Sequence, residues 1–221
     1  LSESYGLPAE DWEAIHLSFD GSLSPSVQTT QKSFFFLMVY AGSLNGGRSV
    51  KGLILALKAL LLERSEIRDS FRLILVGAGA GFEEARILSV KLQLEDVISV
   101  RGSLAKQGVD RLLNDASAVV VVQDDSCFHQ VPGKVFESLK VGKPVIALMP
   151  RDCEAAEILR NSGLGFVHPM HEIKSIQETL ERLWNAWREE SAVVSPNFSF
   201  INSFSFESLR QKVGQTLTEV L

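Results

Sequence analysis

The sequence predicts an α/β fold, a doubly wound parallel sheet of about six strands with helices on both faces. From residue 34 onward, short apolar runs alternate with longer amphipathic ones, which is the order expected of a parallel sheet covered by helices. Runs such as FRLILV and AVVVV are apolar on both faces, as strands between two helical layers must be. The segment 129–148 opens a helix with Pro-Gly-Lys and closes it on Gly-Lys-Pro, residues typical of strand and helix junctions.

The individual elements follow from these runs in chain order. The expected strands are 34–41, 71–76, 97–101, 118–123, 144–148 and 164–168. The expected helices are 50–64, 82–92, 106–114, 133–141 and 153–161, followed by a long polar helix at 172–190 that carries Trp184 and Trp187, and a last helix near 206–220. Six strands joined by right-handed crossovers make a Rossmann-like domain, whose ligands bind beyond the carboxyl ends of the strands.

Composition excludes several classes of function. The 221 residues include 22 basic and 27 acidic ones, and the net charge of −5 argues against nucleic-acid binding but not against a single nucleotide. Cys127 and Cys153 are too few for a disulfide framework and favour a reducing, cytoplasmic setting. Cys127 and His129 lack a third ligand, so no metal is expected. The apolar runs are far shorter than the roughly 18 to 20 residues that span a bilayer.

The glycine-rich stretch LVGAGAGFEEA, residues 75–85, is similar to a dinucleotide fingerprint but does not match it. Phe82 follows Gly77, Gly79 and Gly81 where the third glycine of Gly-x-Gly-x-x-Gly should stand. Two other interpretations remain, a tight turn between strand and helix and a close approach by the sugar or phosphate of another ligand.

The stretch YAGSLNGGRSVKG, residues 40–52, is the better phosphate candidate. It leaves the first strand and places Arg48 and Lys51 at the start of a helix, whose positive dipole end favours anions. Arginine supplies a fork of donors and lysine a point charge, which together suit a diphosphate. The alternative is that both are solvated residues near a helix start.

The helix expected at 133–141 combines a base and an acid on one edge. Pro132 can start the helix, Gly133 permits close approach of a ligand, and Lys134 lies in the first turn. Glu137 follows one turn later on the same side, where its carboxylate can accept two hydrogen bonds from the vicinal hydroxyls of a ribose.

The segment VPGKVFESLKVGKPVIAL resembles the donor-binding segment of retaining glycosyltransferases of the two-domain B-type fold, the sucrose-synthase-like "group 1" family. The stretches LILVGAG, VRGSLAKQGVDRLLNDASAVVVV and GKPVIA occur in that family's order, and the resemblance covers about residues 34–170. It implies only the C-terminal half of such an enzyme, the half that binds the nucleotide sugar.

The resemblance implies a set of site residues. Lys134 and Arg48 are expected to be catalytic, and the residues expected to bind the nucleotide sugar are Gly42, Lys51, Gly77, Arg101, Ser103, Leu104, His129, Gly133, Val135 and Glu137. Backbone around 101–104 would contact the base, and Glu154 or Glu157 would reach the donor sugar, unless these acids only stabilise a helix start.

Two positions depart from the family pattern. Ser43 stands where relatives often carry an arginine, so Arg48 must substitute or the role is vacant. His129 stands where many relatives carry the first of two glutamates, which puts the donor sugar and catalytic competence in doubt.

The ends of the chain complete this interpretation. Residues 1–33 are expected to be the end of an absent N-terminal domain and the interdomain linker, 34–190 the nucleotide-sugar-binding domain, and 191–221 a C-terminal crossover segment and helix. The chain begins at Leu1 and is expected to be a fragment that binds a UDP-, GDP- or ADP-linked sugar but transfers nothing without the acceptor-binding domain. The full-length protein is expected in the cytoplasm, with peripheral association at the membrane left open.

Three alternatives accompany this expectation. A B-fold sugar-nucleotide epimerase shares the architecture and would convert its donor without an acceptor. A degenerate domain retained for assembly or regulation would bind no nucleoside diphosphate. A Rossmann oxidoreductase ranks last and requires a bound dinucleotide, for which the glycine-rich turn is a poor match.

Overall fold

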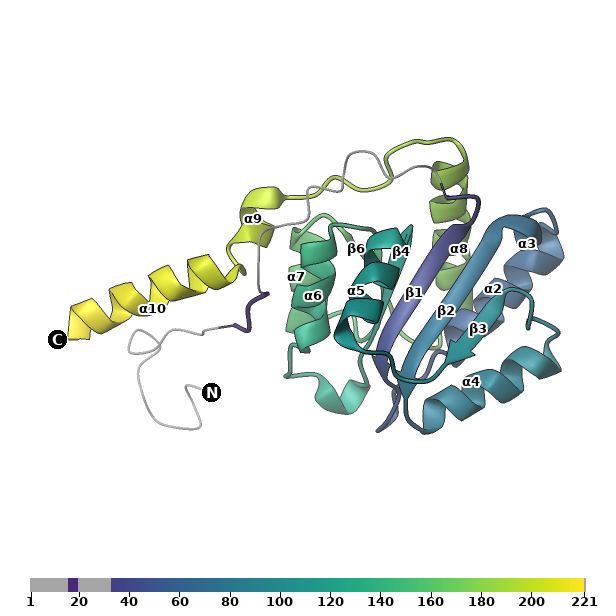
Figure 1. Ribbon diagram of the computed structural model, residues 1–221, viewed down its shortest axis with the longest axis horizontal. Helices are drawn as coiled ribbons and strands as arrows, with labels where there is room; N and C mark the ends of the chain where they lie inside the picture. The colour runs from purple at the N-terminus through teal and green to yellow at the C-terminus, as the bar shows by residue number, and fades with distance from the viewer. Residues whose placement is uncertain (1–15, 20–32, 221) are drawn as a thin grey trace.

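The computed structural model describes residues 16–19 and 33–220 and shows a parallel sheet between two helical layers (Figure 1). Its six strands are β1 (Phe36–Ser43), β2 (Phe71–Ala78), β3 (Ile98–Arg101), β4 (Ala118–Val122), β5 (Val145–Leu148) and β6 (Gly165–His168). They pair in the order β3-β2-β1-β4-β5-β6, and every pairing is parallel. The order reverses between β1 and β4, which makes this the switch point of a doubly wound sheet. The predicted fold class is confirmed.

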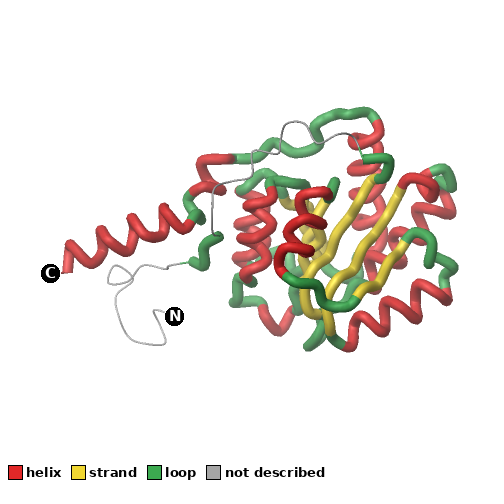
Figure 2. The backbone as a smooth tube through the Cα atoms, in the orientation of Figure 1, coloured by secondary structure: helices red, strands yellow, loops and turns green. Residues whose placement is uncertain are grey.

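Helices cover both faces of the sheet (Figure 2). They are α2 (Lys51–Glu63), α3 (Ile67–Ser70), α4 (Ala80–Lys91), α5 (Lys106–Asp115), α6 (Gly133–Val141), α7 (Glu154–Asn161), α8 (Ile173–Arg188), α9 (Phe198–Asn202) and α10 (Phe206–Val220), with a 3₁₀ turn η2 (Asp125–Cys127). Met38 and Tyr40 of β1 face the core formed with α2, α4 and α8. Val39 faces the opposite side, against α5, while α6 and α7 cover β4 and β5 on a third cluster. Successive side chains of β1 therefore point into hydrophobic clusters on opposite faces of the sheet.

The boundaries differ from expectation mainly beside the glycines. Both β1 and β2 extend beyond the predicted ends, through Ser43 and Ala78, because Gly42 pairs directly with Gly77. α4 begins at Ala80 rather than 82, so Gly81 lies inside the helix. The short elements α3, η2 and α9 were not predicted, since four or five residues carry no readable periodicity.

The segment 16–19 contacts the residues just before α10, beside α6 and α7. Phe19 forms a parallel bridge with Ser205, and its backbone N–H donates to Phe204 O at 3.1 Å. Phe19 is buried in the same cluster as Phe136 of α6. Most of the predicted linker at 1–33 lies outside the described residues. From the bridge, α10 extends away from the sheet (Figure 1).

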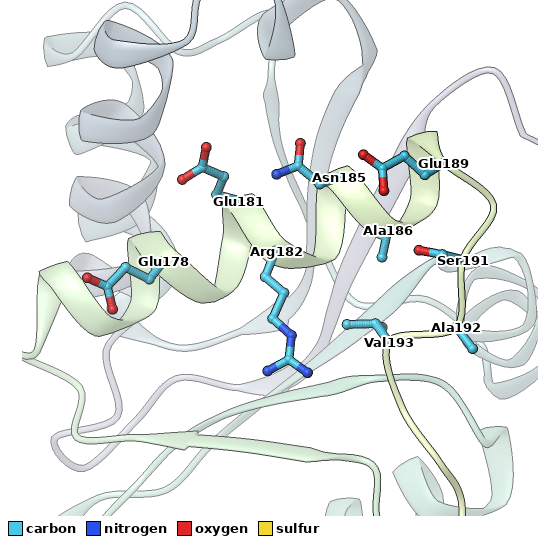
Figure 3. Close-up of a pocket in the computed structure, with 9 residues that line it drawn as sticks. All are labelled: Glu178, Glu181, Arg182, Asn185, Ala186, Glu189, Ser191, Ala192 and Val193. Atoms are coloured by element: carbon cyan, nitrogen blue, oxygen red, sulfur yellow. The ribbon is translucent and has the colours of Figure 1, made fainter.

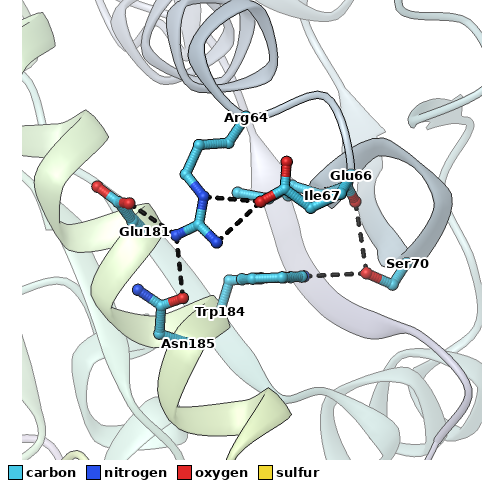
Figure 4. A network of polar contacts seen from close by, with 7 residues as sticks. All are labelled: Arg64, Glu66, Ile67, Ser70, Glu181, Trp184 and Asn185. Atoms are coloured by element: carbon cyan, nitrogen blue, oxygen red, sulfur yellow. Dashed lines mark hydrogen bonds and ion pairs between the residues drawn. The ribbon is translucent and has the colours of Figure 1, made fainter.

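The tryptophans of α8 are packing residues. Trp184 is buried, its indole Nε1 donates to Ser70 Oγ at 3.0 Å, and the guanidinium of Arg64 lies 5.2 Å from its ring centre (Figure 4). Arg64 also bonds Glu181 at 2.8 Å, which ties the end of α2 to α8. Trp187 lies 6.1 Å from the ring of Phe36. Trp184 therefore packs beside α3, and Trp187 packs beside the first residue of β1.

His168, the last residue of β6, makes folding stability depend on pH. Its ring nitrogens lie 3.0 Å from Ser175 Oγ and 3.0 Å from Thr179 Oγ1. Burial, and secondarily the charge of Arg151, lower the pKa of His168 below its ordinary value of 6.5, although Glu172 and Glu178 oppose the shift. The unfolded chain therefore takes up this proton first, so stability is full above pH 6.5 and falls as the pH drops below it.

We expect His168→Gln, which keeps a donor and an acceptor but does not titrate, to remove part of this dependence. Urea unfolding at pH 7.5 and pH 5.5 should show a smaller acid loss of unfolding free energy in the variant than in the wild type. Equal losses would mean that other groups account for the pH dependence.

No helix in the described part of the chain is long and apolar enough to cross a membrane.

Candidate nucleotide-sugar site

The candidate site lies at the carboxyl ends of β1 and β4, where the sheet order reverses. Three segments meet there: the β1–α2 loop (residues 44–50), the β4–α6 loop (residues 124–132) and the start of α6. Parallel sheets bind ligands at this position because neighbouring loops diverge and leave a crevice between them. Some of the predicted site residues lie at this position and others lie away from it.

Lys134 lies directly across Gly42. An ideal Cβ added to Gly42 would stand 3.1 Å from Lys134 Nζ and 2.3 Å from its Cε, and the second distance is closer than real Cβ atoms approach. Gly42 has no side chain, which leaves room for the Lys134 side chain at the end of β1. Lys134 is also the second residue of α6, so its charge adds to the positive end of the helix dipole. Sequence analysis predicted both residues, and the structure brings them together.

Arg48 folds back toward the same strand end. Its Nη1 donates to Ser43 Oγ at 3.4 Å, and the Tyr40 hydroxyl donates to Ser43 O at 2.8 Å. Burial raises the pKa of Tyr40 to about 12, opposed by the nearby charge of Arg48. The guanidinium thus lies beside Ser43, the position where the family resemblance leads one to expect an arginine. Lys51 is the first residue of α2 and its side chain is exposed.

Gly77 is explained by backbone packing alone. Its φ is +146°, and an ideal Cβ would stand 1.7 Å from Gly42 O, so no other residue fits beside β1. The next turn is equally tight, because Gly81 N donates to Leu44 O at 3.0 Å and Ala80 N donates to Asn45 Oδ1 at 3.4 Å. These bonds occupy the first donors of α4, which a dinucleotide pyrophosphate would need. Of the interpretations open for this stretch, the structure favours the tight turn.

The residues expected to contact the base lie apart from Lys134. Arg101 ends β3, and β2 separates that strand from β1. Its Nε donates to Ser99 Oγ at 3.0 Å, so the side chain turns back along its own strand. Ser103 and Leu104 are exposed in the segment before α5. They lie on the β3 side of the switch point, where their backbone is accessible to a ligand.

On α6, the predicted residues have different environments. Glu137 is exposed one turn after Lys134, and Gly133 is exposed at the helix start. Val135 is fully buried, and its N–H donates to Pro132 O at 2.9 Å, so neither its side chain nor its amide is free for a ligand. The binding role of Val135 stays a prediction, and its buried side chain favours a packing role in α6. His129 is exposed on the β4–α6 loop, its ring centre 5.2 Å from that of Phe128.

Sequence analysis missed two residues of the β4–α6 region. Gln123 follows β4, is 1% exposed, and donates through Nε2 to Cys127 O at 2.6 Å and Gln130 O at 2.8 Å. Asp124 lies against the β1–α2 loop, since an ideal Cβ on Gly47 would stand 2.6 Å from its Oδ1. A polar amide directly after four buried valines was the only sequence signal for Gln123.

Glu154, considered for the donor sugar, has a partner elsewhere. Its Oε1 lies 2.6 Å from His16 Nε2, and the His16 ring stands edge-on to Phe204 at 5.7 Å. The contact joins the start of α7 to the N-terminal segment. Within the described ranges, no group of three His, Cys, Asp or Glu side chains could hold a metal ion.

A groove along α8 is unsuited to a phosphate ligand. The groove measures about 440 Å³ and is lined by Glu178, Glu181, Arg182, Asn185, Ala186, Glu189, Ser191, Ala192 and Val193 (Figure 3). Its three carboxylates repel an anion, and the guanidinium of Arg182 lies 5.3 Å from the ring centre of Phe166. The switch point, where Lys134 and Arg48 lie at the end of β1, is therefore the candidate site.

Comparison with solved structures places this architecture among glycosyltransferases. A glycosyltransferase from Rickettsia africae superposes with a TM-score of 0.73 at 15% identity, over 99% of this chain and 60% of that one. HepE from Anabaena, solved with UDP and glucose, gives 0.71 at 20% identity, over 98% and 59%. The lipopolysaccharide outer core galactosyltransferase WaaB gives 0.69 at 16% identity, over 99% and 58%. The chain thus spans about three fifths of each.

Sequence comparison supports the same relationship. No curated protein matches the chain. The family described as "Glycosyl transferases group 1" matches residues 36–186, which include the whole sheet and α2 through most of α8. The matched residues include the switch point together with Lys134, Arg48 and Glu137. The chain therefore belongs to the group 1 glycosyl transferases.

Proposed function

We propose that the chain is the nucleotide-sugar-binding half of a retaining glycosyltransferase that transfers a hexosyl unit from an NDP-sugar to a glycan or lipid-linked acceptor. The observation that carries the proposal is the meeting of Lys134 and Gly42 at the switch point, with the guanidinium of Arg48 beside Ser43 at the end of the same strand. Two cations next to the start of α6 form a site for a diphosphate.

Each cation has a distinct role in this proposal. Lys134 supplies a point charge to the β-phosphate, where negative charge develops as the bond to the sugar breaks. Arg48 supplies two parallel donors to the α- and β-phosphate oxygens. Both act as electrostatic catalysts because they stabilise the departing nucleoside diphosphate, and no metal ion is then required.

The ribose would bind beside Glu137. The carboxylate is exposed and follows Lys134 by three residues on α6, so the two groups share one edge of the helix. An ionised carboxylate accepts hydrogen bonds from both vicinal hydroxyls. Because it repels the negative charge of the diphosphate, the ribose must lie between the two groups. The base then extends toward the backbone of 102–104, on the β3 side of the crevice.

The rest of the enzyme belongs to the proposal as well. The chain spans about three fifths of the solved glycosyltransferases, and the acceptor domain would supply the remainder. α10 extends away from the sheet, with Phe206 half exposed, and would contact that domain. Both cysteines are free, which fits a cytoplasmic enzyme, and a lipid-linked acceptor would bring it to the cytoplasmic membrane face.

Calorimetric titration with UDP, GDP and ADP tests the binding half of this proposal. We expect weak, saturable binding of one of them by residues 1–221, and no transfer to simple acceptors. Glu137→Gln should weaken that binding by about tenfold, because one hydrogen bond to a charged acceptor is lost, worth about 1.5 kcal/mol. Glu178→Gln, an acid on α8, is the matched control and should bind normally.

The outcomes separate the alternatives. Absence of heat with all three nucleotides would contradict the proposal and favour a degenerate domain. Binding together with conversion of the donor in the absence of acceptor would favour an epimerase. Transfer only when the upstream domain is restored would support the glycosyltransferase.

A further inference from the structure

Gln123 is a buried amide whose hydrogen bonds all go to one loop. It lies at the end of β4, beside the switch point, and is 1% exposed. Nε2 donates to Cys127 O at 2.6 Å and to Gln130 O at 2.8 Å. The orientation of the amide is fixed, because a reversed side chain would place its oxygen against two carbonyl oxygens.

The two acceptor carbonyls lie in the middle of the β4–α6 loop and near its end. Cys127 ends the 3₁₀ turn η2, so its carbonyl belongs to the middle of the loop. Gln130 stands two residues before Pro132, the residue that caps α6. One side chain therefore fixes both the middle of the loop and its approach to the helix that carries Lys134. Asp124, at the other end of the loop, rests against Gly47 of the β1–α2 loop.

The Gln123 side chain contributes more to the conformation of the β4–α6 loop than to the free energy of unfolding. Its Oε1 is buried and has no hydrogen-bond partner within the described residues. An unpaired buried oxygen costs about as much as a hydrogen bond contributes, so the net stabilisation from this amide is small. The adjacent strand consists of buried valines, and an apolar side chain would suit that environment better.

We propose that Gln123 is a positioning residue, which holds the β4–α6 loop in the conformation that presents Lys134 and the start of α6 to the diphosphate. The inference rests on the proposed function for its effect on binding, but its effect on the loop does not. Without the amide donor, Gln130 O loses this bond and Cys127 O keeps only the backbone bond from Gln130 N at 2.9 Å, so the loop loses its attachment to β4 and opens to water.

Cys127 provides a readout of the loop that is independent of nucleotide. Its thiol is partly exposed, whereas Cys153 is 1% exposed in the core. Alkylation by iodoacetamide, followed by mass spectrometry, therefore compares Cys127 with an internal reference on the same chain. In the Gln123→Leu variant, we expect iodoacetamide to alkylate Cys127 about tenfold faster than in the wild type. The thermal midpoint of the variant should lie within about 3 °C of the wild-type value.

The same variant should weaken UDP binding about tenfold if UDP is the nucleotide that the wild type binds. Gln123→Glu serves as a second variant, since its carboxylate repels both carbonyls when ionised and donates one hydrogen bond when protonated. Its Cys127 alkylation rate, divided by the wild-type rate at the same pH, should fall toward one as the pH is lowered from 8 to 5. Gln130→Ala is the control, because it removes an exposed side chain and keeps the backbone acceptor.

The results distinguish this inference from the proposed function. If the wild type binds no nucleotide but Gln123→Leu still exposes Cys127, the proposed function fails and the loop-holding role stands. If the wild type binds UDP and both Gln123 variants keep wild-type affinity and Cys127 reactivity, the positioning role is overturned. Unchanged binding with a reactive Cys127 would also overturn it, because the loop would then not govern the site.

Discussion

Gly77→Ala is expected to lower the free energy of unfolding by about 3 kcal/mol or more. The residue has a φ of +146°, which a residue with a side chain rarely adopts, and its Cβ would stand 1.7 Å from Gly42 O. The obstacle is the backbone of the paired strand near the carboxyl end of the β1–β2 pairing, so no side-chain rotation can relieve it. Domains of this size have about 5 to 15 kcal/mol in total, and the loss shows as a thermal midpoint about 10 °C lower.

Gly102→Ala is the matched control for this prediction. Gly102 directly follows β3 of the same sheet, but no atom lies within 4 Å of its ideal Cβ and its φ lies outside the left-handed region. We expect its stability to stay within about 0.5 kcal/mol of the wild type. Thermal and urea unfolding of both variants measure the difference. A Gly77→Ala protein as stable as Gly102→Ala would show that the strands separate at little cost.

Lys134→Ala is expected to weaken nucleoside diphosphate binding by about 30-fold, equivalent to about 2 kcal/mol. The Lys134 side chain lies over Gly42 at the end of β1, which places its charge at the switch point. Removing it leaves the helix start and Arg48 to hold the diphosphate. Binding to the nucleoside without phosphates should be unchanged, because the lysine contacts only the charged portion.

Lys140→Ala on the same helix is the control, because it removes an equal charge from the last turn of α6. Titration at two salt concentrations adds a second test, since a direct phosphate contact makes binding by the wild type more salt-dependent than binding by Lys134→Ala. If Lys140→Ala weakens binding as much as Lys134→Ala does, the effect comes from net charge and Lys134 has no specific role.

The site also shows how a departure from the family pattern is accommodated. The resemblance leads one to expect an arginine where Ser43 stands, and the structure places the guanidinium of Arg48 against the hydroxyl of that serine. Gly46 and Gly47, both with positive φ, let the β1–α2 loop reverse so that a residue five positions later reaches back. The charge expected at this strand end is therefore supplied from another position.

The sequence by itself determined the architecture and the family. Apolar runs of strand length and amphipathic runs of helix length are local patterns, so they predict six strands in their order and the helices between them. The segment 131–148 likewise placed Lys134 and Glu137 on one helix edge, because helical spacing is a property of the chain itself.

Only the tertiary structure decided which of these residues meet. Lys134 and Gly42 are brought together by the pairing of β1 with β4, and Gln123 bonds carbonyls that no periodicity marks. The buried side chain of Val135 and the internal bond of its amide likewise became visible only once α6 was packed. Such contacts depend on sheet order and loop packing between residues far apart in the chain, and local patterns contain no information about them.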